Sequence, residues 1–382
     1  MTSNTTTNLK SAPHPVDWEK FVWIDPRTVS TCKPVGFSLG GVKMVEDGDW
    51  DKAQHPIKET IIYQSLYDMI VNNAPWASTP LYYYIMERIK RNVPQWGCEN
   101  EEHVKLRGEL LCNLCKDIRE AGFIKTQKEL KTYWPTDEIY MSIDRDGKFV
   151  FANNGTHRFF ISHVIGLKRI HVRIYRRHKQ WEDFRAEVYA MCDKFWKGKS
   201  YHKIPHPDFD EIQPIWSDER YDIVKPHIGE NSKTVLDIGS LFGNMCHKFE
   251  LNGYDCTAVE SSLSFLRVMT KLRDASNMKF AIFPKSIFEL QKKEYDVVLA
   301  FNIFHHFLKN KEDCGRLVKF LNELVYKEMY VQFHETHENQ MVDAYKNYTP
   351  DEFAAFILAN SKGKTGYKCI GEEHNRKIYK IY

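Results

Sequence analysis

The chain has 382 residues, of which 42% are hydrophobic and 14% are aromatic, and it carries a formal net charge of +3. Such a chain is long enough for two or three domains with buried cores, which excludes an intrinsically disordered protein. No apolar run reaches the roughly 18 residues of a membrane span, and the first residues lack the apolar core of a signal peptide.

The order of polar, helical and strand-like segments predicts four parts. We expect a flexible tail over residues 1–14 and a first domain over residues 15–200. Three prolines interrupt every periodicity in residues 201–216, which we interpret as a linker. Strand and helix patterns then alternate strictly over residues 217–382, the pattern of a second, α/β domain.

The nine cysteines predict reduced thiols. Cys112 and Cys115 form the one C-x-x-C pair, and they lie in a helical pattern with no second pair at zinc spacing. Buried thiols are therefore favoured over a metal or redox site. Reduced cysteines indicate a cytoplasmic location.

An acidic loop, EDGDWDKAQHPIKET, spans residues 46–60. Asp49 and Asp51 are candidate ligands for Mg²⁺, and Asp49 and Glu59 are candidate bases for an acceptor hydroxyl. The alternative is that the two aspartates form an acidic turn that caps a helix beginning near Pro56.

Residues 139–177 have the pattern of two short strands, an Asn-Gly turn, a short helix, a stop at Gly166 and a final strand. The helix is expected to begin near Thr156, a candidate N-cap, so that His157 and Arg158 lie in its first turn. Free N–H groups and the helix dipole at that end favour an anion. We therefore predict a phosphate-binding turn formed by Asn154, Gly155, Thr156, His157 and Arg158.

This unit resembles the ParB/sulfiredoxin-like superfamily, in which a G-x-x-R or G-x-H-R turn grips phosphate. The matching residues are Gly155, His157 and Arg158. The resemblance implies an α+β domain that binds ATP or CTP with Mg²⁺, and a kinase-like use in which His157 and Arg158 contact the transferring phosphate. A nucleotide-binding domain without phosphotransfer is the alternative.

A basic run follows the predicted helix. Residues 168–185 include seven basic and two acidic side chains. Two interpretations remain open: a solvated strand face, or an electropositive wall for a phosphate-rich ligand.

The second domain begins with a β-α-β pattern over residues 234–262. Asp237, Gly239 and Gly243 lie where the chain must turn sharply, and Glu260 ends the second strand, where it can accept hydrogen bonds from ribose hydroxyls. This pattern resembles the class I S-adenosylmethionine-dependent methyltransferases. The resemblance implies a doubly wound, seven-stranded, Rossmann-like domain that binds S-adenosylmethionine.

Further residues of this domain correspond to the family's cofactor and acceptor sites. Ser286 stands where the family often has an adenine-binding Asp, and Leu241 replaces a glycine, which predicts a wider turn. The segment FNIFHHF places Asn302 beside the cofactor and makes His305 and His306 candidate bases for a hydroxyl. His334 and Glu335 are secondary candidates. The expected cofactor-binding residues are Asp237, Gly239, Ser240, Gly243, Glu260, Ser286 and Asn302.

Together these features favour a bifunctional enzyme: an O-methyltransferase fused to a nucleotide-dependent, kinase-like domain, acting on a hydroxyl or phosphate of a glycan or small molecule. One alternative is a ParB-like nucleic-acid-binding module with a DNA or RNA methyltransferase. A pI near 8.2, no DNA-reading motif and no amino-methylation signature argue against it. The other alternative is a nucleotide sensor without phosphotransfer activity, joined to a methyltransferase.

Overall fold

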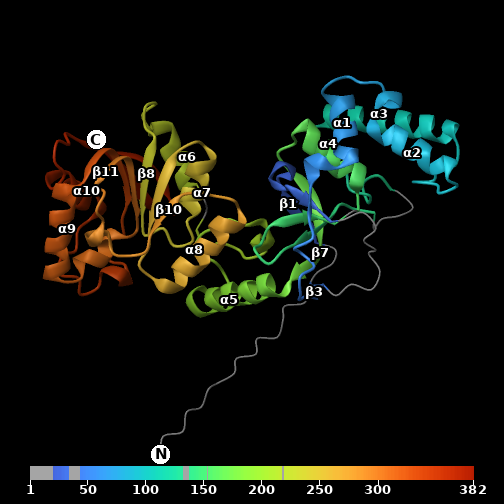
Figure 1. The fold of residues 1–382 in the computed structure, drawn as a ribbon. Helices are drawn as coiled ribbons and strands as arrows, with labels where there is room; N and C mark the ends of the chain where they lie inside the picture. Colours follow the sequence, from blue (N-terminus) through green and yellow to red (C-terminus); the bar gives the residue numbers. More distant parts are fainter. Residues whose placement is uncertain (1–19, 34–43, 132–136, 153, 217–218) are drawn as a thin grey trace, which may run out of the picture. The chain divides into compact units, whose positions relative to one another are not determined.

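The computed structural model describes residues 20–33, 44–131, 137–152, 154–216 and 219–382 (Figure 1). The chain divides into two compact units, residues 1–187 and 188–382. The tail expected over residues 1–14 lies outside the described residues. The predicted domain limits place residues 188–200 with the first domain, whereas these residues belong to the second compact unit.

The first unit combines a mixed sheet with helices. The sheet has the strand order β1-β7-β5-β6-β2-β4, and β3 pairs with β7. Its strands are β1 (Val22–Ile24), β2 (Thr31–Cys32), β3 (Val45–Glu46), β4 (His55–Pro56), β5 (Tyr140–Ile143), β6 (Phe149–Phe151) and β7 (Ile170–His178). Its helices are α1 (Ile61–Ile70), α2 (Pro80–Lys90), α3 (Glu101–Ala121) and α4 (Thr156–Ile165).

The strand–helix–strand unit predicted over residues 139–177 is present as β5, β6, α4 and β7. Gly166 ends α4 in the left-handed conformation, as expected. The predicted N-cap is wrong by one residue: Gly155, with φ of 68°, precedes the helix, and Thr156 is its first residue. A Cβ at position 155 would lie 2.8 Å from Ile139 Cα, so the close approach of β5 explains the glycine.

Cys112 and Cys115 lie in α3, which Asn100 caps at its start and Gly122 ends. All nine cysteines are free thiols, and seven of them are buried. Cys112 is exposed, which corrects the expectation that both thiols of this pair are buried.

The second unit is a doubly wound sheet with the strand order β10-β9-β8-β11-β12-β14-β13. All neighbours from β10 to β12 are parallel, and β14 is antiparallel to both β12 and β13. This arrangement confirms the predicted seven-stranded, Rossmann-like domain with its terminal hairpin. The strands are β8 (Thr234–Ile238), β9 (Asp255–Val259), β10 (Ala281–Phe283), β11 (Glu294–Phe301), β12 (Val325–Gln332), β13 (Tyr367–Glu373) and β14 (Arg376–Ile381).

Helices cover both faces of this sheet (Figure 1). Side chains alternate along β11, so Val298 and Ala300 pack with α9 and α10, whereas Val297 and Leu299 pack with α7 and α8. Residues 297–300 of β11 are buried on both faces, which explains why this part of the strand is an uninterrupted hydrophobic run. The helices are α5 (Lys179–Trp196), α6 (Arg220–Val224), α7 (Asn244–Leu251), α8 (Leu263–Ala275), α9 (Lys311–Glu323) and α10 (Pro350–Ala359).

The segment that we interpreted as a linker is an ordered part of the second unit. Ile215 N donates to Ser200 O at 2.8 Å, and Trp216 N donates to Tyr201 O at 3.2 Å, which folds the segment back on itself. Ile204, Phe209 and Ile212 are buried. Residues 201–216 therefore pack as part of this unit instead of spanning open solvent.

Candidate active site

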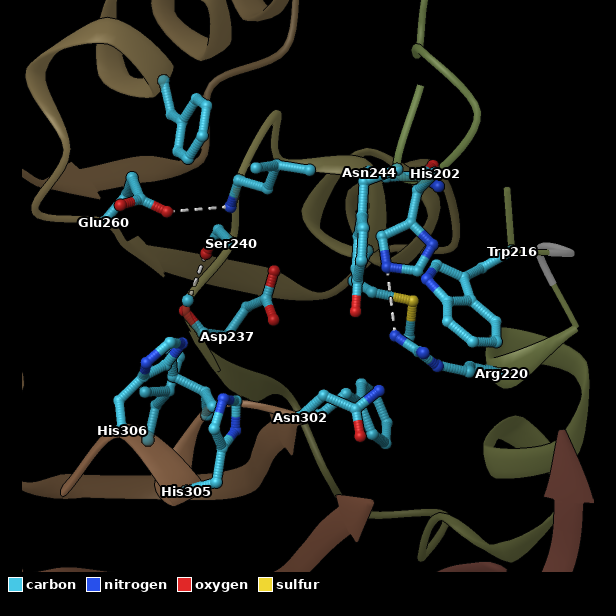
Figure 2. A pocket seen from close by; sticks show the side chains of 18 of the residues that line it. His202, Trp216, Arg220, Asp237, Ser240, Asn244, Glu260, Asn302, His305 and His306 are labelled. Atoms are coloured by element: carbon cyan, nitrogen blue, oxygen red, sulfur yellow. Dashed lines mark hydrogen bonds between the residues drawn. The ribbon is translucent and has the colours of Figure 1, made fainter. Parts of the chain in front are cut away.

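A cavity of about 730 Å³ lies in the second unit at the carboxyl ends of β8, β9 and β11. This is the edge at which open α/β sheets bind their ligands. In the view of Figure 2, Glu260 and Asp237 lie on one side, Arg220 and Trp216 lie on the other, and His305 lies below.

The turn after β8 brings the backbone to the cavity. Gly239, Leu241 and Gly243 all have positive φ, at 74°, 52° and 76°. A Cβ on Gly239 would lie 2.7 Å from Ile303 Cδ1, so only glycine fits without displacing the segment after β11. Leu241 has no such freedom, and its positive φ marks a strained turn directly at the site.

Asp237 is buried at the start of this turn and lines the cavity. Burial raises the pKa of its carboxyl to about 6. Its backbone oxygen accepts from Ser240 Oγ at 2.7 Å, which fixes the turn, and Cys246 Sγ lies 3.8 Å from Oδ2. Asp237 therefore stabilises the turn by accepting this hydrogen bond.

Glu260 follows β9 and ties two segments together. Oε1 accepts from the backbone N–H groups of Ser261 and Ser262 at 2.9 and 2.8 Å, and Oε2 accepts from Leu241 N at 3.1 Å. Burial raises its pKa. A carboxylate has about four acceptor positions, so Oε2 keeps one of them for a ligand.

Three imidazoles meet in the wall of the cavity. The rings of His305 and His306, in the 3₁₀ helix η7 (Phe304–Leu308), have centroids 4.0 Å apart, and those of His305 and His334 lie 4.2 Å apart. Burial lowers the pKa of all three side chains, and each of the other two also lowers that of His305. The group is therefore neutral near pH 7.

Two arginines also line the cavity, Arg220 buried and Arg376 half-buried. Arg376 Nε donates to Glu338 Oε1 at 3.0 Å, and Arg220 Nε donates to Glu373 Oε2 at 2.5 Å. In the amide orientation that satisfies both arginines, Asn302 Oδ1 accepts from each of them at 3.1 to 3.2 Å. Asn302 thus holds the two guanidinium groups together at the floor of the cavity.

An aromatic wall completes the cavity, formed by residues that sequence reasoning missed. Trp196 stacks on Phe265 with ring centroids 6.0 Å apart, and Tyr201 and Trp216 follow in the former linker. The density of aromatic residues around the prolines was the signal available in the sequence. These rings supply flat, apolar surfaces beside the cavity.

Some expected site residues do not line the cavity. Ser286 caps the 3₁₀ helix η6 (Ile287–Glu289) through Phe288 N, and neither Ser286 nor Glu335 is part of the wall. Gly243 caps α7 from behind, where a Cβ would lie 3.0 Å from Phe280.

The expected phosphate turn of the first unit is engaged within the protein. Arg158 is buried, and its guanidinium lies 3.4 Å from Asp137 and 3.6 Å from Glu138. Asn154 Nδ2 donates to Glu138 O at 2.6 Å. Burial lowers the pKa of His157 to about 4, and its ring contacts Trp96. In the structure, Arg158 of this turn therefore pairs with acidic residues of the protein itself.

The acidic loop holds an arginine. Asp51 Oδ2 accepts from Arg145 Nε at 2.7 Å and from its backbone N at 3.0 Å, and Asp49 Oδ1 accepts from Arg145 Nη2 at 2.9 Å. Burial alone would raise the pKa of Asp51, but these bonds lower it to about 2. Glu59 is exposed on the 3₁₀ helix η2 (Ile57–Glu59). Within the described ranges, no group of three or more His, Cys, Asp or Glu side chains is arranged to hold a metal ion.

The aspartates of this loop cap no helix. Thr60 caps α1 by accepting from Tyr63 N, so the expectation that Asp49 and Asp51 cap a helix near Pro56 is wrong.

Three of the seven basic residues in the run over residues 168–185 are buried in the first unit, whereas Lys168, Arg169 and Lys179 are exposed. Arg176, Arg177 and Arg185 are 1%, 6% and 6% exposed. Arg176 pairs with Glu46, and Arg185 pairs with Glu182 at 2.8 Å. The interpretation as a solvated strand face is therefore wrong for these three arginines.

Comparison with known proteins identifies a methyltransferase domain in the second unit: residues 236–325 match the family model of that name. No curated protein sequence is significantly similar to the chain. The matched segment covers the glycine turn, Glu260 and the two histidines of η7. A methyltransferase domain implies S-adenosylmethionine as methyl donor.

Solved structures with similarity to the chain include methyltransferases. The bifunctional kinase-methyltransferase WbdD is 16% identical, over 48% of this chain and 43% of that chain, with a TM-score of 0.41. A putative O-methyltransferase from Nostoc punctiforme is 18% identical, over 42% and 55% of the two chains, with a TM-score of 0.32. The methyltransferase domain of bacterial CtHen1 is 17% identical, over 42% and 93%, with a TM-score of 0.33. The chain spans less than half of the length of WbdD.

In the part of the chain that the structure describes, no helix combines the length and the apolar character that a membrane crossing requires.

Proposed function

We propose that the second unit is an S-adenosylmethionine-dependent O-methyltransferase. The observation that carries the proposal is that one cavity is lined by the glycine turn, by Glu260 and by the three imidazoles. A donor in contact with the turn would thus have titratable groups near its reactive end. The cavity volume of about 730 Å³ is in the range of small-molecule sites.

The residues that line this cavity fit S-adenosylmethionine. Glu260 Oε2 keeps an acceptor position for one ribose hydroxyl, and Gly239 lets the turn pack closely against Ile303 at the edge of the cavity. Asp237 and Ser240 would hold the turn in place. When bound, S-adenosylmethionine supplies an electrophilic methyl group on a sulfonium, and the protein has to orient the acceptor in line with it.

The proposal includes a kinase-like role for the first unit, with ATP or CTP and Mg²⁺ as ligands. It rests on the resemblance of the Gly155–Thr156–His157–Arg158 turn. Because Arg158 faces Asp137 and Glu138, nucleotide binding requires the guanidinium to exchange these partners, or the phosphate to bind the N–H groups of α4 alone. We also retain a glycan or small-molecule acceptor and a cytoplasmic location, for which the seven buried thiols are the support.

One experiment separates the parts of this proposal. The protein is titrated calorimetrically with S-adenosylmethionine, ATP and CTP, and then incubated with labelled cofactors and a panel of sugars, sugar phosphates and nucleic acids. Binding of S-adenosylmethionine with methyl transfer to a sugar supports the methyltransferase. A wild-type protein that binds none of the donor at millimolar concentration refutes it. Transfer to nucleic acid alone would favour the nucleic-acid alternative.

A further inference from the structure

The three imidazoles at the acceptor end differ in their partners. His305 and His306 belong to η7, and His334 follows β12. All three line the cavity, yet a general base must also hold the proton that it takes. The charged and titratable groups around them are Lys309, Glu338 and Arg376.

The surroundings of His305 do not stabilise its protonated form. Its Nδ1 is buried and has no hydrogen-bond partner among the described residues. Burial is the main cause that lowers the pKa of His305. The other contributions come from His306, His334, Lys309 and Arg376, and each of them also lowers it. His306 has the same kind of surroundings, with His334 and Lys309 nearby. An imidazolium at either position would lack a counter-ion.

His334 has the missing counter-ion. Its Nδ1 lies 2.8 Å from Glu338 Oε2, so the tautomer with Nδ1–H donating to the carboxylate is favoured, and Nε2 keeps its lone pair. Among the residues that the structure describes, the ring hydrogen bonds through Nδ1 to Glu338, and His334 itself lines the cavity. His334 is neutral near pH 7 because burial lowers its pKa, and Glu338 opposes that shift.

Glu338 is held in place on three sides. Oε1 accepts from Glu335 N at 2.9 Å and from Arg376 Nε at 3.0 Å, and Arg376 Nη2 bonds to Oε2. Burial alone would raise the pKa of Glu338, but these bonds and His334 lower it, so the carboxylate stays ionised. A fixed anion behind an imidazole orients the ring and stabilises its protonated form.

From this geometry we infer that His334 is the general base of methyl transfer, that Glu338 is its positioning residue, and that the acceptor is a neutral hydroxyl. The inference rests on the proposed function and names its substrate class. A phosphate oxygen is already ionised at pH 7 and needs no base, whereas a hydroxyl of high pKa does.

The step balances with groups on the protein and in the proposed reaction. The acceptor oxygen forms a bond to the methyl carbon, the carbon–sulfur bond breaks, and its electron pair stays on sulfur. The hydroxyl proton moves to His334 Nε2. The imidazolium pairs with Glu338 until it releases the proton to water.

The test compares His334→Gln with His337→Gln, a matched control on an exposed histidine three residues away that does not line the cavity. Labelled S-adenosylmethionine is used with glucose, galactose and their 1-phosphates as acceptors. We expect His334→Gln to lower kcat about 100- to 1,000-fold with the free sugars at pH 7, with unchanged calorimetric affinity for the donor. His337→Gln should match the wild type.

Glu338 is tested by a readout that does not need turnover. NMR titration of the His334 imidazole should give a lower pKa in Glu338→Gln than in the wild type, and Glu338→Asp should restore part of the difference. Circular dichroism identifies variants that do not fold. Since Glu338 also holds Arg376, the Asp variant keeps the test valid if Gln unfolds the site.

Several results overturn the inference. If His334→Gln keeps more than half of the wild-type kcat, or if His306→Gln alone abolishes transfer, His334 is not the base. Methylation of the sugar phosphates alone, at a rate that His334→Gln leaves unchanged, refutes the hydroxyl class while the proposed methyltransferase stands. A wild type that does not bind the donor removes both together.

Discussion

Replacement of Glu260 tests the cofactor side of the cavity most directly. Glu260→Gln keeps the size of the side chain but leaves one acceptor oxygen where the carboxylate had two. If that oxygen continues to accept from Ser261 and Ser262, the new amide nitrogen faces Leu241 N and the ribose position. One charge-assisted bond to the donor is lost, which costs about 2 kcal/mol, or roughly thirtyfold in affinity.

Glu260→Ala should have a larger effect, because all three N–H groups lose their acceptor. At about 1 kcal/mol for each bond, the free energy of unfolding falls by about 3 kcal/mol in addition to the loss of affinity. Calorimetry with S-adenosylmethionine and urea unfolding measure the two quantities. Glu294→Ala is the control, since this exposed glutamate begins β11 at the opposite edge of the sheet. A folded Glu260→Gln or Glu260→Ala variant with wild-type affinity would refute the role of this carboxylate.

Three further predictions concern the turn, the buried aspartate and the first unit. Gly239→Ala should lose binding of S-adenosylmethionine and be about 1–3 kcal/mol less stable than the control Gly253→Ala. Gly253 also has a positive φ, but no atom lies within 4 Å of its new Cβ. Equal urea midpoints of the two variants would contradict this prediction. The pKa of Asp237 is raised from 3.8 to about 6 in the folded protein, so the free energy of unfolding should fall by about 2 kcal/mol as pH rises from 4 to 6. In Asp237→Asn, urea titrations should no longer show this fall in the free energy of unfolding. If the free energy of unfolding depends on pH equally in both proteins, the raised pKa of Asp237 is refuted. Arg158→Ala should weaken ATP or CTP binding by about 2 kcal/mol without affecting S-adenosylmethionine, and should destabilise the first unit because Glu138 loses its partner. Calorimetric titrations that show equal nucleotide affinity would remove Arg158 from the proposed phosphate site.

Local patterns predicted the second unit well. The central parts of β8, β11 and β12 are buried and apolar, over residues 235–236, 297–300 and 329–331, and these short runs marked the strands. The glycine turn and the acid after β9 are also local features, since they lie within one β-α-β unit.

The acceptor end depends on contacts between distant residues. Arg376 lies 38 residues after Glu338, and Arg220 lies 153 residues before Glu373, so neither pair is visible in a local pattern. The aromatic wall was hidden for another reason. Tyr201 and Trp216 lie in residues 201–216, where prolines interrupt the periodicities that mark helices and strands. Backbone hydrogen bonds such as Ile215 N to Ser200 O order this segment.

The same limit applied to the first unit. The turn sequence correctly predicted a helix after Asn154, but no local signal shows that Glu138 faces Arg158. Asp49 and Asp51 were read as metal ligands because carboxylates were the visible chemistry, whereas Arg145 binds them from 94 to 96 residues away.

The position of β14 bears on how the protein is made. This strand lies between β12 and β13, although it follows both of them in the sequence. A nascent chain that ends after β13 therefore exposes the unpaired edge of β12 and lacks Arg376, so Glu338 has no guanidinium partner. Such a chain can already hold the glycine turn and Glu260, which come from β8 and β9. The glycine turn and Glu260 thus come from early strands of this domain, whereas the acceptor end is complete only once β14 has paired with β12.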